Sequence, residues 1–383
     1  MTMKLKTAAC FLLIVIQTSY VCFAGETVLR PRINAMLEYN DNLFFSRTDT
    51  LDDFVVKASP EFDLAYTSDK IYMKTGMLFD FYEYLDNSYL SDSYYTLDFQ
   101  NRFSLTEKAG LSLDFIAEKS RSLDSDLAET GTITVFNDKR TGSLSLGYSY
   151  LFTDRLEVNI NSSYAKIDYD SELHTDYKSQ YFSATVYRKL ANRVDTIIIQ
   201  PYYSGFRTEL SDVDSFGLYT GLSHLFNETL SVSLNIGARY TETSYFYIFK
   251  EDDWGGLANI SVEKSGETWK SGLSLSRDLK FGSYGEAIET NQVKLNFEKN
   301  IYDDLKYSFR GSYTDSDSSG RFRDEETEYY NVTNSLEYRL NQDVTVGGSY
   351  TYASHYSDNW EVDEDADRNL IRINIKYVLK PMY

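Results

Sequence analysis

The sequence has very little cysteine, proline or histidine. Its two cysteines, Cys10 and Cys22, both lie in the first 24 residues, and the 383-residue chain has only 4 Pro and 3 His. A Cys/His site or a disulfide framework is therefore excluded for the rest of the chain. Proline removes hydrogen bonds from a β-ladder, so its scarcity favours strands.

Long apolar runs are missing as well. Beyond residue 24 no stretch approaches the 18 consecutive apolar residues that a membrane helix needs. The beginning of the chain has a shorter one: Lys4 and Lys6 precede the apolar run Ala8–Ile16, and Cys22-Phe23-Ala24 follows it. This order predicts a signal peptide over residues 1–24, cleaved after Sec-type export.

The chain is poor in positive charge and in catalytic motifs. It has 58 Asp and Glu against 38 Lys and Arg, a net charge of −20. This balance argues against nucleic acid as a partner. No nucleophile elbow, HExxH helix or P-loop is present, and His174 beside Asp176 lies in a polar stretch typical of solvated surface. We therefore expect neither an enzyme nor a cofactor.

Aromatic residues are abundant, and apolar residues recur at every second position. The chain has 34 Tyr and 23 Phe. In one run Val232, Leu234 and Ile236 alternate with Ser233 and Asn235. A period of two places each set on one face of a sheet. In a transmembrane barrel only every second residue faces lipid, which explains the polar mean hydropathy of −0.42.

Short polar connections alternate with longer acidic ones along the chain. Thr153-Asp154 and Asn341-Gln342 are examples of the short set. Examples of the longer set are Asn40–Asp53, Ser122–Asp138, Asp315–Glu328 and Tyr356–Asp367. Outer-membrane barrels have this asymmetry, with short periplasmic turns and long extracellular loops, whereas a soluble β-sandwich or β-helix does not need it. We predict one all-β domain over residues 25–383, an antiparallel up-and-down barrel of 18 strands, with 16 as the alternative.

The polar face of the strands predicts a lumen wall of mixed charge. The lumen-facing candidates are Lys57, Lys74, Asp98, Arg102, Asp114, Glu118, Arg239, Arg310, Arg339 and Arg372. Mixed charge gives no strong ionic preference, and Tyr and Asn beside carboxylates and Arg suit neutral sugars. The alternative is that these charges only pair across the wall and stiffen the barrel.

Two of the longer segments have further features. Ser122–Asp138 contains the apolar residues Ile133, Val135 and Phe136, and is the best candidate for a constriction loop that folds inward. Asp363–Asp367 resembles the start of a calcium loop, but it has no glycine at the turn and no closing glutamate. We interpret it as a solvated loop and predict no metal site.

Glu38-Tyr39-Asn40-Asp41-Asn42-Leu43-Phe44 resembles the opening of the β-barrel porin-2 family of outer-membrane proteins. The size, aromatic content and hairpin rhythm of residues 25–383 are similar to that family too. The resemblance implies an outer-membrane barrel associated with exopolysaccharide, capsule or exosortase systems. The family has no agreed catalytic residues, so the resemblance implies none here.

Three functions stay open at this point. The first is a channel or accessory protein for exported polysaccharide, the second a general diffusion porin, and the third a non-conducting surface or adhesion barrel. The expected partners are outer-membrane lipid and lipopolysaccharide, polysaccharide, periplasmic export proteins and the barrel assembly machinery. The aromatic C-terminal residue Tyr383 is common in barrels delivered to that machinery.

Overall fold

A computed structural model describes residues 25–132, 136–245, 249–282, 285, 287–320, 323–359 and 363–382. The strands are β1 (Glu26–Asn40), β2 (Asp53–Thr67), β3 (Ile71–Tyr84), β4 (Asp92–Thr106), β5 (Ala109–Arg121), β6 (Asp138–Thr153), β7 (Leu156–Tyr169), β8 (Tyr177–Lys189), β9 (Asp195–Arg207), β10 (Ser211–Asn227), β11 (Leu230–Tyr245), β12 (Phe249–Ser265), β13 (Trp269–Phe281), β14 (Ala287–Tyr302), β15 (Leu305–Gly320), β16 (Arg323–Arg339), β17 (Val344–Asn359) and β18 (Asp363–Val378).

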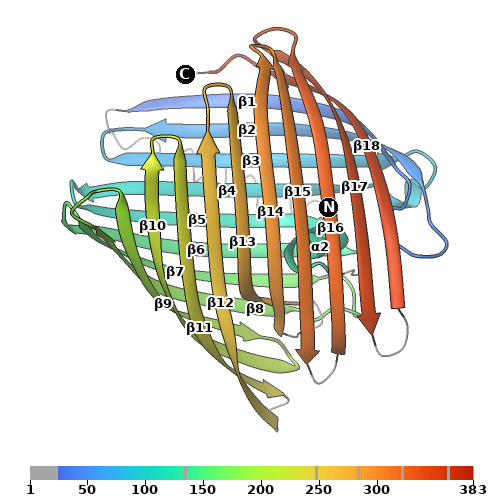
Figure 1. The fold of residues 1–383 in the computed structure, drawn as a ribbon. Helices are drawn as coiled ribbons and strands as arrows, with labels where there is room; N and C mark the ends of the chain where they lie inside the picture. Colours follow the sequence, from blue (N-terminus) through green and yellow to red (C-terminus); the bar gives the residue numbers. More distant parts are fainter. Residues whose placement is uncertain are drawn as a thin grey trace, which may run out of the picture.

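The strands form one closed barrel. Each pairs antiparallel with the next in sequence, and β1 pairs with β18 to close the ring, as Figure 1 shows. Closure leaves no free sheet edge along most of the wall, so the backbone hydrogen bonds are made between neighbours. The predicted 18-strand barrel is confirmed, and the 16-strand alternative is wrong.

The outer face carries the apolar side chains that the alternation predicts. Leu234 is 42% exposed and Ile236 54% exposed, whereas the intervening Asn235 lies on the inner face. The same pattern recurs on other strands, for example at Phe54, Val56, Phe62, Leu144, Leu146, Leu218, Leu222, Leu336, Ile371, Ile373 and Ile375. A continuous exposed apolar band is stable only against lipid, so the barrel is of the membrane-spanning, outer-membrane type.

The two ends of the barrel differ. The short turns lie at one end together with both described termini, where Leu29 and Met382 exchange backbone hydrogen bonds. At the other end the strands run farther than predicted. Most of Asp315–Glu328 and Tyr356–Asp367 is paired strand rather than loop. Strand pairing needs only backbone groups, so polar hairpins can continue the sheet into water above the apolar band.

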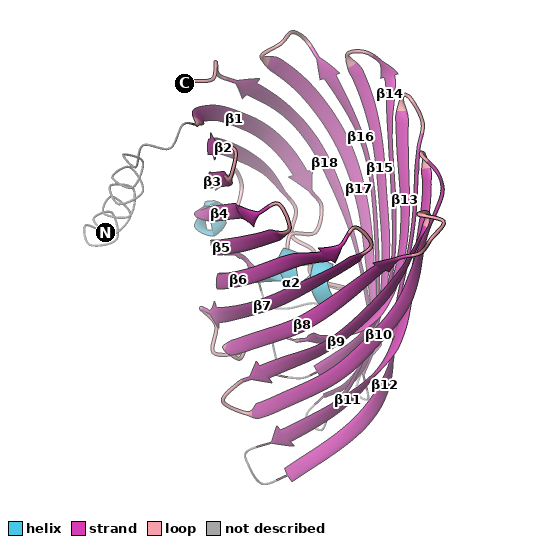
Figure 2. Cartoon of the chain, turned by 90° about the vertical axis from the view of Figure 1, so that its left-hand side faces the viewer, coloured by secondary structure: helices cyan, strands magenta, loops and turns pink. Residues whose placement is uncertain are grey.

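The described residues contain two short helices, η1 (Ser88–Leu90) and α2 (Ser122–Thr130). Neither is long and apolar enough to cross a membrane. Figure 2 shows α2 inside the ring of strands. Helix α2 ends at Thr130 and is capped by Gly131, which adopts φ 75°, a left-handed conformation that glycine reaches without the usual steric cost.

Candidate functional site: the lumen and its inward segments

The predicted charged residues are spread round the inner wall and do not form one cluster. Several form ion pairs: Lys57 with Asp80 (2.9 Å), Lys74 with Asp63 (3.2 Å), Arg102 with Asp114 (2.6 Å), Arg310 with Glu298 (4.0 Å), and Arg372 with Glu38. Asp98 accepts a hydrogen bond from Gln100 (2.7 Å), and Glu118 faces Thr96 and Thr141 in the register. Arg339 pairs with Asp304 (2.8 Å) at a short turn. Pairing along the wall fits the stiffening interpretation for many of these charges.

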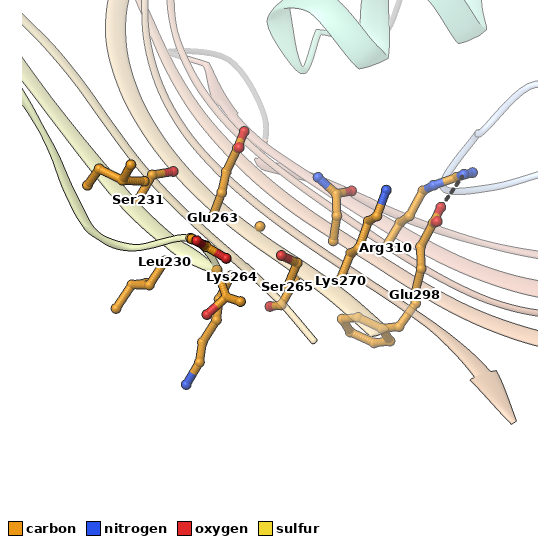
Figure 3. Close-up of a pocket in the computed structure, with 15 residues that line it drawn as sticks. Leu230, Ser231, Glu263, Lys264, Ser265, Lys270, Glu298 and Arg310 are labelled. Carbon is orange, nitrogen blue, oxygen red and sulfur yellow. Dashed lines mark ion pairs between the residues drawn. The ribbon is translucent and has the colours of Figure 1, made fainter. Parts of the chain in front are cut away.

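In the half of the lumen near the short turns, charged side chains of the inner wall are exposed to solvent. A cavity of about 500 Å³ there is lined by Lys270, Glu298, Arg310 and residues of the adjoining turns. Figure 3 shows the Arg310–Glu298 pair beside Lys270. Arg310 is 66% exposed and Arg102 is 50% exposed, although both face inward. Water therefore reaches the inner wall in this half.

The other half is crossed by residues 122–132 and 136–137, here called the inner loop. It leaves the wall between β5 and β6, and α2 packs on the wall formed by β16–β18. Leu123 and Leu127, each 1% exposed, join Tyr329, Ala353 and Ala366 in one apolar cluster. Burying two leucines from a loop stabilises its docked position by roughly 3–6 kcal/mol before entropy is counted. The inner loop connects β5 and β6 but packs against β16–β18, which lie elsewhere in the wall.

Polar contacts fix both sides of the inner loop. Arg368 Nη1 on β18 donates a 3.0 Å hydrogen bond to Asp124 Oδ1. Lys139 Nζ on β6 donates to Asp126 Oδ1 (2.9 Å), and both side chains are almost fully buried. The Asp124 side chain is 52% exposed but lies inside the barrel, where partial desolvation alone would raise its pKa. The guanidinium groups of Arg368 and Arg121 outweigh this effect and hold that pKa below its usual value.

Phe136 lies near the end of the inner loop, two residues before β6 begins. The Arg121 guanidinium lies 4.9 Å from its ring centroid and 4.5 Å from that of Tyr82, and Phe44 meets it edge-on at 5.3 Å. Ile133 and Val135 lie outside the described residues. The structure therefore places Phe136 inside the barrel, and the narrowing of the conduction path by this segment stays a prediction.

The motif that carries the family resemblance supports the inner loop. After β1 the chain turns inward, so that Leu43 is 2% exposed and Phe45 only 1% exposed. Asn42 holds the turn: its Nδ2 donates to the carbonyls of Ser46 (2.8 Å) and Asp367 (3.0 Å). Phe45 then packs on Leu123 and Leu127. The sequence shows the motif, but it does not show that the motif supports the inner loop, because the inner-loop residues that this segment contacts lie far away in the chain.

A second inward segment comes from the β13–β14 hairpin, and the sequence analysis did not anticipate it. In the described chain, pairing between β12 and β13 ends at Ala258 and Arg277. Beyond that point β13 turns away from β12, as Figure 1 shows at its lower end. Phe281 stacks on Phe206 of β9 with ring centroids 4.3 Å apart and planes 7° apart. Ser211 Oγ on β10 donates to the Gly285 carbonyl (2.6 Å).

Glu289 of β14 joins this hairpin to the wall. One carboxylate oxygen accepts a 2.7 Å hydrogen bond from Arg239 on β11, and the other pairs with Arg277 on β13. Arg239 is 2% exposed and also donates to Thr241 (2.9 Å). By the register, Glu289 and Phe281 belong to the outer face of their strands, and Arg239 and Phe206 to the inner face. The hairpin therefore packs its outer face on the inside of the barrel.

A chamber of about 560 Å³ is bounded by these two segments and by the wall of β7–β10. The end of α2 (Ala128–Thr130) forms one side and Asp278–Phe281 another. Tyr181, Tyr202 and Tyr219 line the wall. This chamber, rather than the scattered charges, is where the structure brings chemically different side chains together.

No metal centre emerges from the described residues, among which no group of three or more His, Cys, Asp or Glu side chains could hold an ion. Asp365, in the segment that resembles a calcium loop, instead pairs with Arg47 at 3.5 Å.

A comparison with protein-family models finds no match, and neither does one with curated proteins. Solved structures do match. OccK2 (OpdF) of Pseudomonas aeruginosa in complex with glucuronate is 9% identical, with 92% of this chain and 98% of that chain covered and a TM-score of 0.51. OpdK of the same organism with vanillate is 9% identical, with 93% and 99% covered and a TM-score of 0.50. Identity this low shows the fold alone, so the β-barrel porin-2 resemblance stays a prediction.

Proposed function

We propose that this protein is an outer-membrane channel for small polar solutes whose extracellular half is narrowed by the inner loop and the β13–β14 hairpin. The observation that carries the proposal is the contrast between the two halves. Charged inner-wall side chains are solvated near the short turns, whereas two docked segments occupy the lumen beyond them. Water and small solutes can enter such a lumen, and large ones meet an obstruction.

Export of a long polysaccharide is the second candidate. A polymer needs a continuous clear path, and both inward segments are held by buried packing and ion pairs. The tyrosines of the chamber favour sugar as cargo, because aromatic rings stack on the apolar faces of sugar rings. Because both segments would have to move for a polymer to pass, we favour small solutes as the cargo.

The experiment is single-channel recording in planar bilayers. Leu123→Asp with Leu127→Asp should undock α2, because carboxylates cannot be buried in that apolar cluster. We expect conductance to rise severalfold. Leu173→Asp is the matched control, since this loop leucine is 67% exposed and its substitution should change nothing. Glucuronate, the solute in the OccK2 structure, is a useful test permeant.

The outcomes separate the candidates. Absence of current in every preparation would contradict the proposal and favour a non-conducting surface barrel. Normal small-solute uptake in a deletion strain that has lost surface polysaccharide would favour export instead. Unboiled protein should also migrate differently from boiled protein in detergent gels, because a closed ladder resists unfolding, and this difference checks that each variant is folded.

A further inference from the structure

The chamber has an ordered set of tyrosines on its wall. The rings of Tyr181 on β8 and Tyr202 on β9 are 5.8 Å apart at 24°, and those of Tyr202 and Tyr219 on β10 are 5.7 Å apart at 29°. Three nearly parallel rings thus cross three neighbouring strands. Tyr202 is 8% exposed and lies between the other two, which are half-buried and present ring surface to the chamber.

Gly217 explains why the rings can lie this way. It pairs with Tyr202 in the register, and a Cβ at Gly217 would be 2.2 Å from Cε1 of the Tyr202 ring. Contacts that short do not occur, so the ring needs glycine beside it. The backbone of β10 therefore supports Tyr202, and Tyr202 positions Tyr181 and Tyr219.

The polar side chains round these rings carry balanced charge. The lining contains two carboxylates, Glu129 and Asp278, and two ammonium groups, Lys280 and Lys294. Ser204 and Gln292 add groups that can donate or accept hydrogen bonds. Balanced charge gives no preference for an ion, whereas hydroxyl groups can bond to every one of these side chains. A cavity of about 560 Å³ is in the range of small-molecule sites.

We propose that the chamber binds a neutral pyranose sugar of one or two rings. The sugar stacks on Tyr181 and Tyr219, and its hydroxyl groups form hydrogen bonds with the charged side chains that line the chamber. This site rests on the proposed channel function and names its solute class. An acyclic polyol has the hydroxyls without the flat apolar face, so it should bind much more weakly.

The test measures maltose binding to the detergent-solubilised full barrel by calorimetry, and block of current by maltose in planar bilayers, with sorbitol as the acyclic comparison. Tyr219→Ala and Tyr181→Ala should each weaken maltose binding about three- to tenfold. Tyr219→Phe should keep most of it because the ring remains. Tyr187→Ala is the matched control: this tyrosine faces the lumen from β8 but does not line the chamber.

Calorimetry tests the sugar site and the bilayer current tests the channel function, so the two proposals can fail separately. Current without maltose binding, or equal effects of maltose and sorbitol, would overturn the sugar site and leave the channel standing. Binding without current would support the sugar site and overturn the channel. Equal loss of binding in Tyr187→Ala and Tyr219→Ala would show that the chamber is not the site.

A different observation, the register of β12 and β13, leads to a second inference. The pairing Ala258–Arg277 continues a constant register from Ser265–Lys270. Extending it places Gly256 opposite Leu279 and Trp254 opposite Phe281. All four would then be on the outer face, and Trp254 already faces outward at 72% exposure beside Tyr240. The apolar side chains of Leu279 and Phe281 thus suit an outer-face position as well as their present position inside.

We infer that the β13–β14 hairpin is a gate with two positions. In the position seen here Phe281 stacks on Phe206 inside the barrel. In the other, β13 completes its ladder with β12, Phe281 pairs with Trp254 at the edge of the apolar band, and the lumen clears. In the described chain, residues 254–257 of β12 have no ladder partner on β13. Re-pairing these residues with β13 would add backbone hydrogen bonds, which offset the lost internal contacts.

Cysteine crosslinking tests both positions, because residues 25–383 contain no native cysteine. Phe206→Cys with Phe281→Cys, joined by a short bismaleimide, should lock the gate and reduce conductance. Trp254→Cys with Phe281→Cys should crosslink in native outer membranes and raise conductance. Trp254→Cys with Leu275→Cys, two outer-face positions out of register, is the control and should crosslink far more slowly. Failure of the Trp254–Phe281 pair to crosslink faster than this control would overturn the gate.

Discussion

Arg239 on β11 donates a 2.7 Å hydrogen bond to Glu289 on β14, although two strands separate β11 from β14 in the wall. An inner-face residue can meet an outer-face residue only if one of the strands has left the wall. The pair therefore shows that the β13–β14 hairpin folds into the barrel. Together with the docked inner loop, the hairpin places two packed segments inside the half of the barrel that lies away from the short turns.

Glu289→Gln should destabilise the barrel. The change leaves the guanidinium of Arg239, 2% exposed, without its charged partner, and an uncompensated buried charge costs more than the pair contributes. We expect a loss of about 2 kcal/mol, since glutamine still accepts one hydrogen bond. Urea unfolding of the refolded barrel in detergent measures it. Glu242→Gln, which breaks the exposed pair with Lys250, should leave stability unchanged; equal losses would mean that the Arg239 pair is not special.

Charge on the lipid face should be costly, and charge on the lumen face should be tolerated. Leu234→Arg places a guanidinium in the apolar band and should cost roughly 2–4 kcal/mol near the midplane. Asn235→Arg, one residue along the same strand, points into the solvated lumen and should fold normally. Unfolding in lipid vesicles compares the two. Similar damage from both would mean that the inner and outer faces of β11 are reversed.

The sequence predicts the wall well and the interior poorly. Alternation such as Val232-Leu234-Ile236 reports which residues share a face, and short turns report where strands end, so strand number and orientation follow from local information. Alternation does not say whether a hairpin stays in the wall. Phe281 has the spacing of a lipid-facing residue, yet it stacks on Phe206 inside the barrel.

The inner loop shows the same limit. The length and apolar content of Ser122–Asp138 predict that it folds inward, but they do not predict the helix or its partners. Leu123 and Leu127 bury against Tyr329 and Ala353, which follow some two hundred residues later in the chain. Contacts of such long range leave no periodic signal in either segment. The tyrosine chamber is likewise assembled from three separate regions, so composition suggests sugar chemistry without locating it.

Acid should release the inner loop. The pKa of Asp124 is lowered because Arg368 and Arg121 outweigh the partial desolvation of its carboxylate, so the ionised carboxylate stabilises the docked loop more than the undocked one. A group with a lowered pKa contributes this stability above its ordinary pKa of about 3.9 and loses it as the pH falls through the lowered value. We therefore expect conductance to be constant near neutral pH and to rise below about pH 4.

Asp124→Asn should raise conductance at neutral pH and flatten its rise in acid, because the pair with Arg368 is already lost. Glu172→Gln, at an exposed position in the β7–β8 loop, is the control and should keep the wild-type pH profile. Single-channel recording between pH 7 and pH 3 follows both variants. A wild-type profile in Asp124→Asn would assign the acid response to other carboxylates and leave α2 held by its two leucines and by the Lys139–Asp126 pair.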